Sequence, residues 1–168
     1  SYLPDWRPGR DYRDTSSAKT DAGGGVLLEL SHELDYVQWL AGPLEVEYAV
    51  SGKVSDLEID SDDLLLLSGK TEGGARVYIS LNYFTRKPVR QIVIDGEGIS
   101  LQGDLIKNQL SQVVDGEASD YSWSELERND TYREQHRAIL EGDLSRVCSF
   151  EEGLNIMRLI ENIRGWRN

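Results

Sequence analysis

One of the chain's two histidines, His32, stands among carboxylates at helical spacing. With Glu29, Glu33 and Tyr36 it forms an i, i+3, i+4, i+7 series that shares one stripe of a helix, and Asp35 flanks it on the other side. A neighbouring carboxylate orients an imidazole and stabilises its protonated form. This is the material of a general acid/base, which moves a proton when an alcohol and a carbonyl interconvert. A surface histidine in a salt-bridged stripe is the alternative, and these residues alone leave both open.

Three consecutive glycines at 23–25 open the same segment. Without side chains, Gly24 and Gly25 would let backbone amides at a helix N-terminus approach a substrate closely. A tight turn packed beneath a sheet has the same composition, and for the glycines alone we favour that turn.

The preceding stretch, "YLPDWRPGRDYR", is a basic and aromatic cluster in an acidic chain. Arginine forks match carboxylate or phosphate, and aromatic faces suit sugar rings. The competing interpretation is a solvated loop whose arginines pair with neighbouring aspartates. We take the cluster as a candidate substrate-binding segment, with Trp6, Arg7, Arg10, Tyr12 and Arg13 as its candidate residues.

Composition restricts the partners and the compartment. The 168 residues carry a formal net charge of -12, which argues against nucleic acid and anionic membranes as partners. The single cysteine excludes an internal disulfide and fits a cytoplasmic protein. No aliphatic run approaches the length of a membrane span. No H-E-x-x-H or related ligand spacing occurs, so we expect no metal site.

Hydrophobic spacing predicts the elements that position these residues. An apolar stripe at three- and four-residue intervals predicts one helix over 26–41, which Gly42-Pro43 ends. In the next segment Leu44, Val46, Tyr48 and Val50 alternate with other residues, which predicts a strand with these four on one face. Further strands are expected in hairpins around 72–74 and 96–98 and at 105–114, then a loop at 115–127.

Two helices close the chain, one over 129–141 and one that starts at a capping box of Ser149 and Glu152. Strands joined by short glycine turns pair antiparallel, and the helices lie apart from them in the sequence. The predicted class is α+β, an open, largely antiparallel β-sheet with helices packed on one face. Its other face carries enough apolar residues to be buried in a partner.

The stretch "GGGVLLELSHELDYVQWLAG", a β-rich region and the terminal "SFEEGLNIMRLIENIRG" together resemble the C-terminal domain of the Gfo/Idh/MocA oxidoreductases. These are relatives of glucose-fructose oxidoreductase and inositol dehydrogenase, and the resemblance covers nearly the whole chain. It implies that residues 1–168 are a single substrate-binding and oligomerisation domain of a two-domain enzyme. NAD or NADP would bind mainly to an N-terminal Rossmann domain absent from this chain, so the fragment itself should bind no cofactor and be inactive alone.

The resemblance also implies roles for residues. His32 matches the family's histidine that acts as acid/base, the substrate would be sugar-like, and the open sheet face would form a homo-oligomer. Many members place an aspartate four residues before this histidine, where this chain has Leu28, with Glu29 three before. Glu29 would therefore either contact substrate or orient His32, and Tyr36 would lie on the substrate side of the stripe.

These observations predict the substrate-binding part of an NAD(P)-dependent oxidoreductase. The substrate would be a sugar, a cyclitol, or a nucleotide-linked or acidic sugar that reacts at a hydroxyl. The alternative is a non-catalytic sugar-binding or assembly module derived from the same family, which the departure at Leu28 favours.

Overall fold

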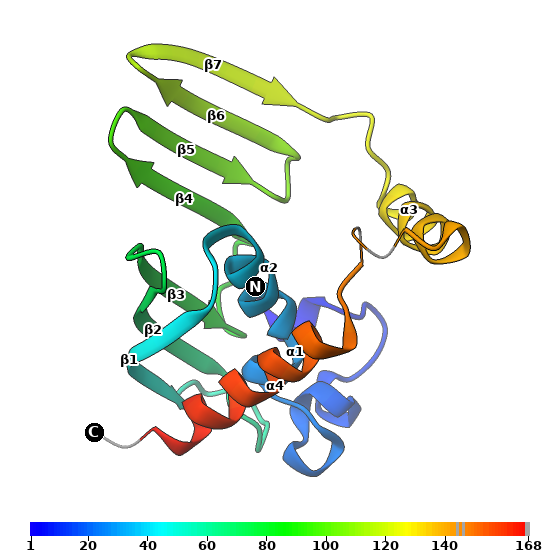
Figure 1. The fold of residues 1–168 in the computed structure, drawn as a ribbon. Helices are drawn as coiled ribbons and strands as arrows, with labels where there is room; N and C mark the ends of the chain where they lie inside the picture. The colour runs from blue at the N-terminus through cyan, green and yellow to red at the C-terminus, as the bar shows by residue number, and fades with distance from the viewer. Residues whose placement is uncertain (144, 146, 167–168) are drawn as a thin grey trace. The chain divides into compact units, whose positions relative to one another are not determined.

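The computed structural model describes residues 1–143, 145 and 147–166 (Figure 1). Contacts within the chain divide it into two compact units, Ser1–Arg86 with Ser149–Asn168, and Lys87–Cys148. Helices and antiparallel strands make up both, which confirms the predicted α+β class.

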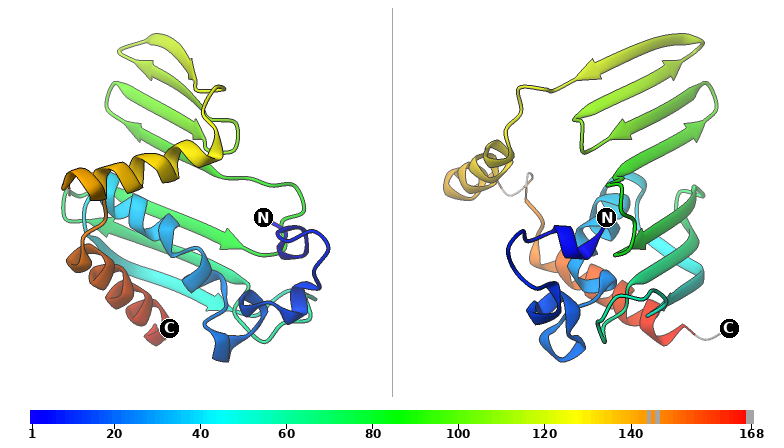
Figure 2. Two further views of the ribbon diagram at one scale, coloured as in Figure 1. Left: turned by 90° about the vertical axis from the view of Figure 1, so that its right-hand side faces the viewer. Right: turned by 180° about the vertical axis from the view of Figure 1, so that it is seen from behind.

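The first unit is a three-stranded antiparallel sheet covered on one face by helices. Strands β1 (Leu44–Gly52), β2 (Leu64–Thr71) and β3 (Arg76–Asn82) are ordered β1-β2-β3, as the predicted hairpin around 72–74 requires. Helices α1 (Val26–Glu29), α2 (Ser31–Ala41) and α4 (Phe150–Gly165) lie across one face of this sheet (Figure 2).

The core lies between that sheet face and the helices. Leu65, Leu67 and Ile79 point from the strands into it, in the alternation of a half-buried sheet. Helix α4 contributes residues at three- and four-residue spacing, namely Ile156, Leu159, Ile160 and Ile163. Its predicted capping box is confirmed, since Ser149 Oγ accepts from the Glu152 amide and Glu152 accepts from the Ser149 amide.

The predicted continuous helix over 26–41 is wrong at one residue. Leu30 has φ −106° and ψ 23°, outside helical values, and it separates α1 from α2. The Glu33 amide donates to the Leu30 carbonyl at 2.9 Å as the second helix begins. The apolar stripe runs on across the break, so spacing alone did not reveal it.

The predicted face of β1 is also wrong beyond its middle. A β-bulge shifts the register between Val46 and Tyr48, and the faces exchange from that point on. Ala49 is therefore buried, whereas the Tyr48 side chain is exposed on the face away from the helices.

Residues 1–22 precede α1 as four short 3-10 turns, η1 (Leu3–Asp5), η2 (Tyr12–Asp14), η3 (Ser16–Ala18) and η4 (Thr20–Ala22). The segment is fixed to the end of β3, because the Leu3 amide donates to the Tyr83 carbonyl at 2.8 Å and Tyr2 forms a bridge with Phe84. Leu3 is buried in the core. The arginine-bearing loop is thus held by its own apolar anchor.

The second unit contains a four-stranded antiparallel meander and one helix. The strands are β4 (Gln91–Gly96), β5 (Ile99–Asp104), β6 (Gln109–Val114) and β7 (Glu117–Ser122), and the helix is α3 (Arg128–Glu141). The predicted loop over 115–127 is wrong, because β7 pairs with β6 through a two-residue turn. Asp115 and Gly116 have φ of 51° and 85°, values that suit an Asp-Gly hairpin turn.

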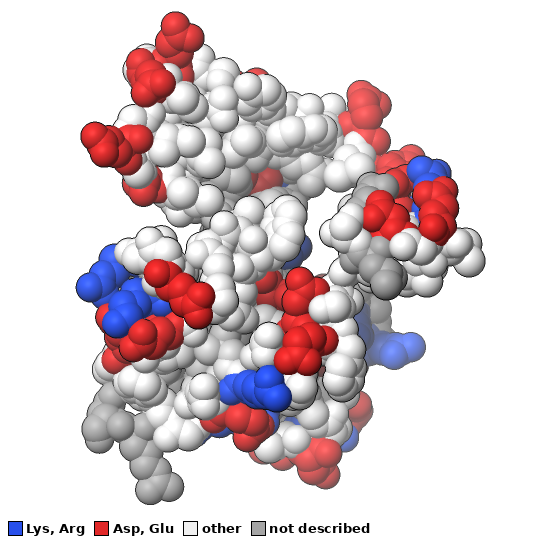
Figure 3. Space-filling model, viewed as in Figure 1, with Lys and Arg blue, Asp and Glu red and all other residues white. Residues whose placement is uncertain are grey.

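One face of the meander is rich in apolar residues. The register aligns Ile92, Leu110 and Tyr121 on that face, and Tyr121 stacks on Trp123 with ring centroids 6.2 Å apart. No strand residue of this sheet is buried. In the view of Figure 3 this sheet presents a largely uncharged surface with acidic side chains at its margins.

Across the part of the chain that the structure describes, no helix combines the length and the apolar character needed to cross a lipid bilayer.

A buried carboxylate organises the loop between β1 and β2. Asp63 is fully buried, and it accepts hydrogen bonds from the Val54 amide and from the amide and hydroxyl of Ser55. Burial opposes its ionisation, but these bonds and Lys53 Nζ at 3.5 Å together hold the pKa of Asp63 below its usual value. The Asp63 carboxylate therefore stabilises the fold only while it is charged.

We expect Asp63→Asn to lower the free energy of unfolding by about 2–3 kcal/mol at neutral pH, since it removes charge-assisted hydrogen bonds. Because the folded pKa is lowered, the stabilisation is present above the unfolded pKa of about 3.9 and is lost as pH falls through the folded value. Urea unfolding from pH 7 down to pH 3 should show the two proteins converging. Exposed Asp56 in the same loop is the control, and an equal loss in Asp56→Asn would contradict this account.

Candidate functional site

His32 is the second residue of α2, and its ring is half exposed. Its Nε2 lies 3.2 Å from Oε1 of Glu33, whose side chain is only 9% exposed against 53% for His32. The Tyr36 hydroxyl, one turn further along, donates to the other oxygen of Glu33. The structure therefore brings together three members of the predicted stripe, with Glu33 at the centre.

Glu29, the fourth member, points into a different network. It lies on α1, before the break at Leu30, and Ser17 Oγ donates to its Oε1 at 2.7 Å. Arg7 Nη1 donates in turn to Ser17 Oγ at 3.2 Å. No contact joins Glu29 to His32 among the described residues. The predicted single stripe is therefore wrong, because the break at Leu30 separates Glu29 from the other three residues.

Sequence reasoning named Glu33 only as a stripe member and not as a site residue. Its burial could not be read from the helical spacing, because burial depends on which neighbours pack against the helix. The sequence did contain one signal for the role of Glu33. Tyr36, a hydroxyl donor, follows it by three residues on the same helix face.

The phenol of Tyr83 is buried near Glu29, Asp62 and Arg7. Burial raises its pKa, the charges of Glu29 and Asp62 act in the same direction, and Arg7 opposes them. Trp6 packs edge-on against the Tyr83 ring at 5.1 Å, and its indole N–H donates to Ser1 Oγ at 3.0 Å. The Trp6 ring is partly buried and packs against the core, and its predicted contact with substrate stays a prediction.

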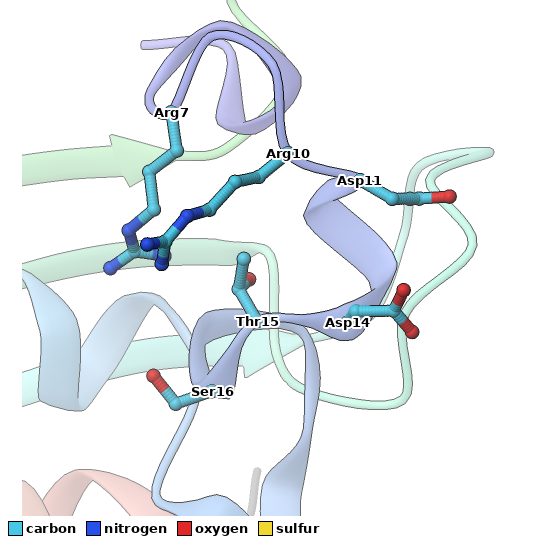
Figure 4. A pocket seen from close by; sticks show the side chains of 6 residues that line it. All are labelled: Arg7, Arg10, Asp11, Asp14, Thr15 and Ser16. Carbon is cyan, nitrogen blue, oxygen red and sulfur yellow. The ribbon is translucent and has the colours of Figure 1, made fainter.

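A pocket of about 470 Å³ opens beside the first turns, lined by Arg7, Arg10, Asp11, Asp14, Thr15 and Ser16. In Figure 4 the guanidinium groups of Arg7 and Arg10 lie side by side and point inward, toward the side where Thr15 and Ser16 lie. The side chains of Asp11 and Asp14 point away from them. Arg10 forms no ion pair with any described residue. Two convergent guanidinium groups suit a carboxylate or a phosphate.

The third predicted arginine, Arg13, forms ion pairs with two nearby carboxylates. Arg13 pairs with Asp11 at 2.5 Å and with Glu58 at 2.6 Å, and its hydrogen bonds lower the pKa of Asp11 to about 2. The Tyr12 hydroxyl accepts from the Glu58 amide at 3.2 Å. Arg13 and Tyr12 thus tie the η2 turn to the loop before β2. Their predicted contact with substrate stays a prediction.

The glycines also have a structural role. A Cβ on Gly24 would lie 2.2 Å from the Ser16 carbonyl oxygen, and one on Gly25 would lie 2.2 Å from Asp62 Oδ1. Their amides already donate to the carbonyls of Lys19 and Ser17. The structure therefore has the packed turn, and the use of this turn for substrate stays a prediction.

The same bonds bear on cofactor binding. Dinucleotide sites use free amides at a helix N-terminus after a glycine-rich loop. Here the Val26 and Leu27 amides donate to the backbone and side chain of Asp62, so this helix start does not fit a pyrophosphate. Within the described ranges no three His, Cys, Asp or Glu side chains converge as a metal site.

Comparison with known proteins identifies a family. The model of the GFO/IDH/MocA C-terminal domain matches residues 1–102. A search of curated protein sequences gives no significant match.

Three solved structures share the fold. UDP-N-acetylglucosamine 3-dehydrogenase GnnA from Acidithiobacillus ferrooxidans matches with a TM-score of 0.68 and 17% identity, over 83% of this chain and 46% of that one. An NAD binding oxidoreductase from Klebsiella pneumoniae matches with a TM-score of 0.67 and 17% identity, over 90% of this chain and 51% of that one. The WlbA dehydrogenase from Bordetella pertussis in complex with NADH and UDP-GlcNAcA matches with a TM-score of 0.59 and 20% identity, over 95% of this chain and 48% of that one. The chain spans about half the length of these proteins.

The packing of Gly25 leads to a stability prediction. Gly25→Ala should be more destabilising than Gly74→Ala by about 1–3 kcal/mol, because both have positive φ but only Gly25 faces a neighbouring side chain. Urea unfolding of both variants measures the difference. Equal losses of unfolding free energy would show that the Asp62 side chain moves aside at no energetic cost, which would contradict the packing described.

Proposed function

Because the chain belongs to the Gfo/Idh/MocA oxidoreductase family through its C-terminal domain, we propose that it is the substrate-binding part of an NAD(P)-dependent oxidoreductase acting on a sugar hydroxyl. The observation that carries this proposal is the His32–Glu33 pair. A half-exposed imidazole is held against a buried carboxylate, at the helix position where the family's acid/base histidine is expected.

In the proposed reaction the substrate's O–H and adjacent C–H bonds break and a C=O bond forms. The nicotinamide of NAD or NADP, held by a separate N-terminal domain, would accept the hydride at C4. This chain contributes the proton transfer: a ring nitrogen of His32 takes the hydroxyl proton. A group with an exposed ring and a carboxylate behind it suits that step in both directions.

We propose that the substrate is anionic, an acidic or a nucleotide-linked sugar. The support is the pocket in which Arg7 and Arg10 converge while the neighbouring aspartates turn away. In an acidic chain, two adjacent guanidinium groups facing a hollow would select a negatively charged ligand. The WlbA structure with bound UDP-GlcNAcA gives a specific compound to test.

The assembly and setting follow from the same proposal. Residues 1–168 would form one substrate-binding and oligomerisation domain of a two-domain enzyme. Its open sheet faces would join it to a second copy, since exposed Tyr48, Leu66 and Tyr78 all lie on the outward face of β1–β3. With one cysteine in the chain, the reducing cytoplasm is the proposed compartment.

Replacing His32 by alanine in the whole enzyme should lower kcat about 100-fold or more, the usual cost of losing an acid/base. The assay follows nicotinamide absorbance over a panel of sugars, cyclitols, sugar acids and UDP-sugars. His136→Ala, which changes the chain's other histidine, should leave kcat unchanged. A near-wild-type rate for His32→Ala would contradict the proposed role. Binding of a panel compound without turnover by the unmodified enzyme would support the non-catalytic module instead.

Arg10→Ala should raise KM about 10- to 100-fold for an anionic substrate, because a charge-assisted hydrogen bond is lost. Comparing UDP-GlcNAcA with UDP-GlcNAc separates the two possible anions. A rise confined to the acid assigns the arginines to a carboxylate, and equal rises assign them to the phosphates. Arg13→Ala, whose guanidinium is held by Asp11 and Glu58, is the control. Unchanged KM for both compounds would remove the pocket from the proposal.

A further inference from the structure

We infer that Glu33, and not Glu29, is the residue that positions His32 for proton transfer, an inference that rests on the proposed function. Nothing in the helical spacing favours Glu33 over Glu29, since both lie on the expected stripe. The structure distinguishes them by burial, by distance and by the partners that each carboxylate already has.

Glu33 has the properties that a positioning group needs. The residue is 6% exposed, so its carboxylate is largely shielded from water and from salt. Its Oε1 is 3.2 Å from His32 Nε2, while its Oε2 accepts the Tyr36 hydroxyl. One oxygen is thus bonded to Tyr36 on the same helix, and the other faces the imidazole.

Glu29 is committed elsewhere. It receives the Ser17 hydroxyl at 2.7 Å, and Ser17 receives Arg7. Its charge also lies close enough to the buried phenol of Tyr83 to raise the pKa of that group. Glu29 therefore belongs to the network that connects α1 to the arginine-bearing loop.

This geometry also assigns the two ring nitrogens of His32. A carboxylate at Nε2 favours the tautomer with its proton on Nε2. Nδ1 then carries the lone pair, and it makes no hydrogen bond within the described residues. Nδ1 is accordingly the atom that accepts the substrate's hydroxyl proton, while Nε2 stays directed at Glu33.

The test is a set of variants of the whole enzyme, assayed with UDP-GlcNAcA and NAD⁺. Glu33→Gln keeps the size and removes the charge, and it should lower kcat about 10- to 100-fold with KM within about twofold, as expected for a misplaced catalytic group. Glu33→Asp, which restores a carboxylate, should recover part of the loss. Asp35→Asn is the matched control, since Asp35 lies on the same helix without a partner among the described residues.

A double-variant cycle separates positioning from general damage to the fold. If Glu33 acts through His32, the double variant with His32→Ala and Glu33→Gln should be no slower than His32→Ala alone. Thermal unfolding of the same four proteins gives a second readout, in which the Tm shifts of the two single changes should not add.

Each outcome decides one claim. Wild-type kcat in Glu33→Gln, or losses that multiply in the double variant, would overturn the role of Glu33 while His32 kept its own. A larger kcat loss in Glu29→Gln than in Glu33→Gln would return the positioning role to Glu29. A wild-type rate in His32→Ala would instead overturn the proposed function, and with it any role for Glu33 through His32.

Discussion

The close packing of the glycine turn against Asp62 and the 16–19 carbonyls is the constraint on which the site depends. Gly24 and Gly25 leave no room for a Cβ, so the turn that precedes α1 lies directly on these neighbours. Asp62 then accepts both the Val26 and the Leu27 amides, which fixes where the helix begins. The direction of every side chain on α1 follows from this anchor. Glycine is required at 24 because a Cβ would meet backbone carbonyl oxygens, and at 25 because a Cβ would meet the Asp62 side chain.

The break at Leu30 divides the acidic stripe between two tasks. Before it, Glu29 is directed toward Ser17 and the arginine-bearing loop. After it, the start of α2 turns Glu33 into the core side and leaves His32 at the surface. A continuous helix would have placed both carboxylates in register with the imidazole. The short non-helical step instead directs Glu29 toward Ser17 and leaves Glu33 beside the histidine.

Much of the fold could be predicted from the sequence because it depends on local signals. The capping box at Ser149 and the glycine turns of two hairpins needed only neighbouring residues. The bulge between Val46 and Tyr48 and the break at Leu30 could not be predicted. Each leaves the apolar pattern readable while changing which face that pattern occupies. The same limit applied to the site. Residue types suggested His32 and the arginines as candidates. Which carboxylate faces the imidazole, and which arginine is already paired, depend on tertiary contacts.

The most direct test of this account is a crystal structure of the whole enzyme with UDP-GlcNAcA and the nicotinamide cofactor bound. We predict Nδ1 of His32 within hydrogen-bonding distance of the reacting hydroxyl, with Glu33 at Nε2 and the guanidinium groups of Arg7 and Arg10 on an anionic group of the ligand. A structure in which His32 turns away from the sugar, or in which Glu29 replaces Glu33 beside the imidazole, would contradict it.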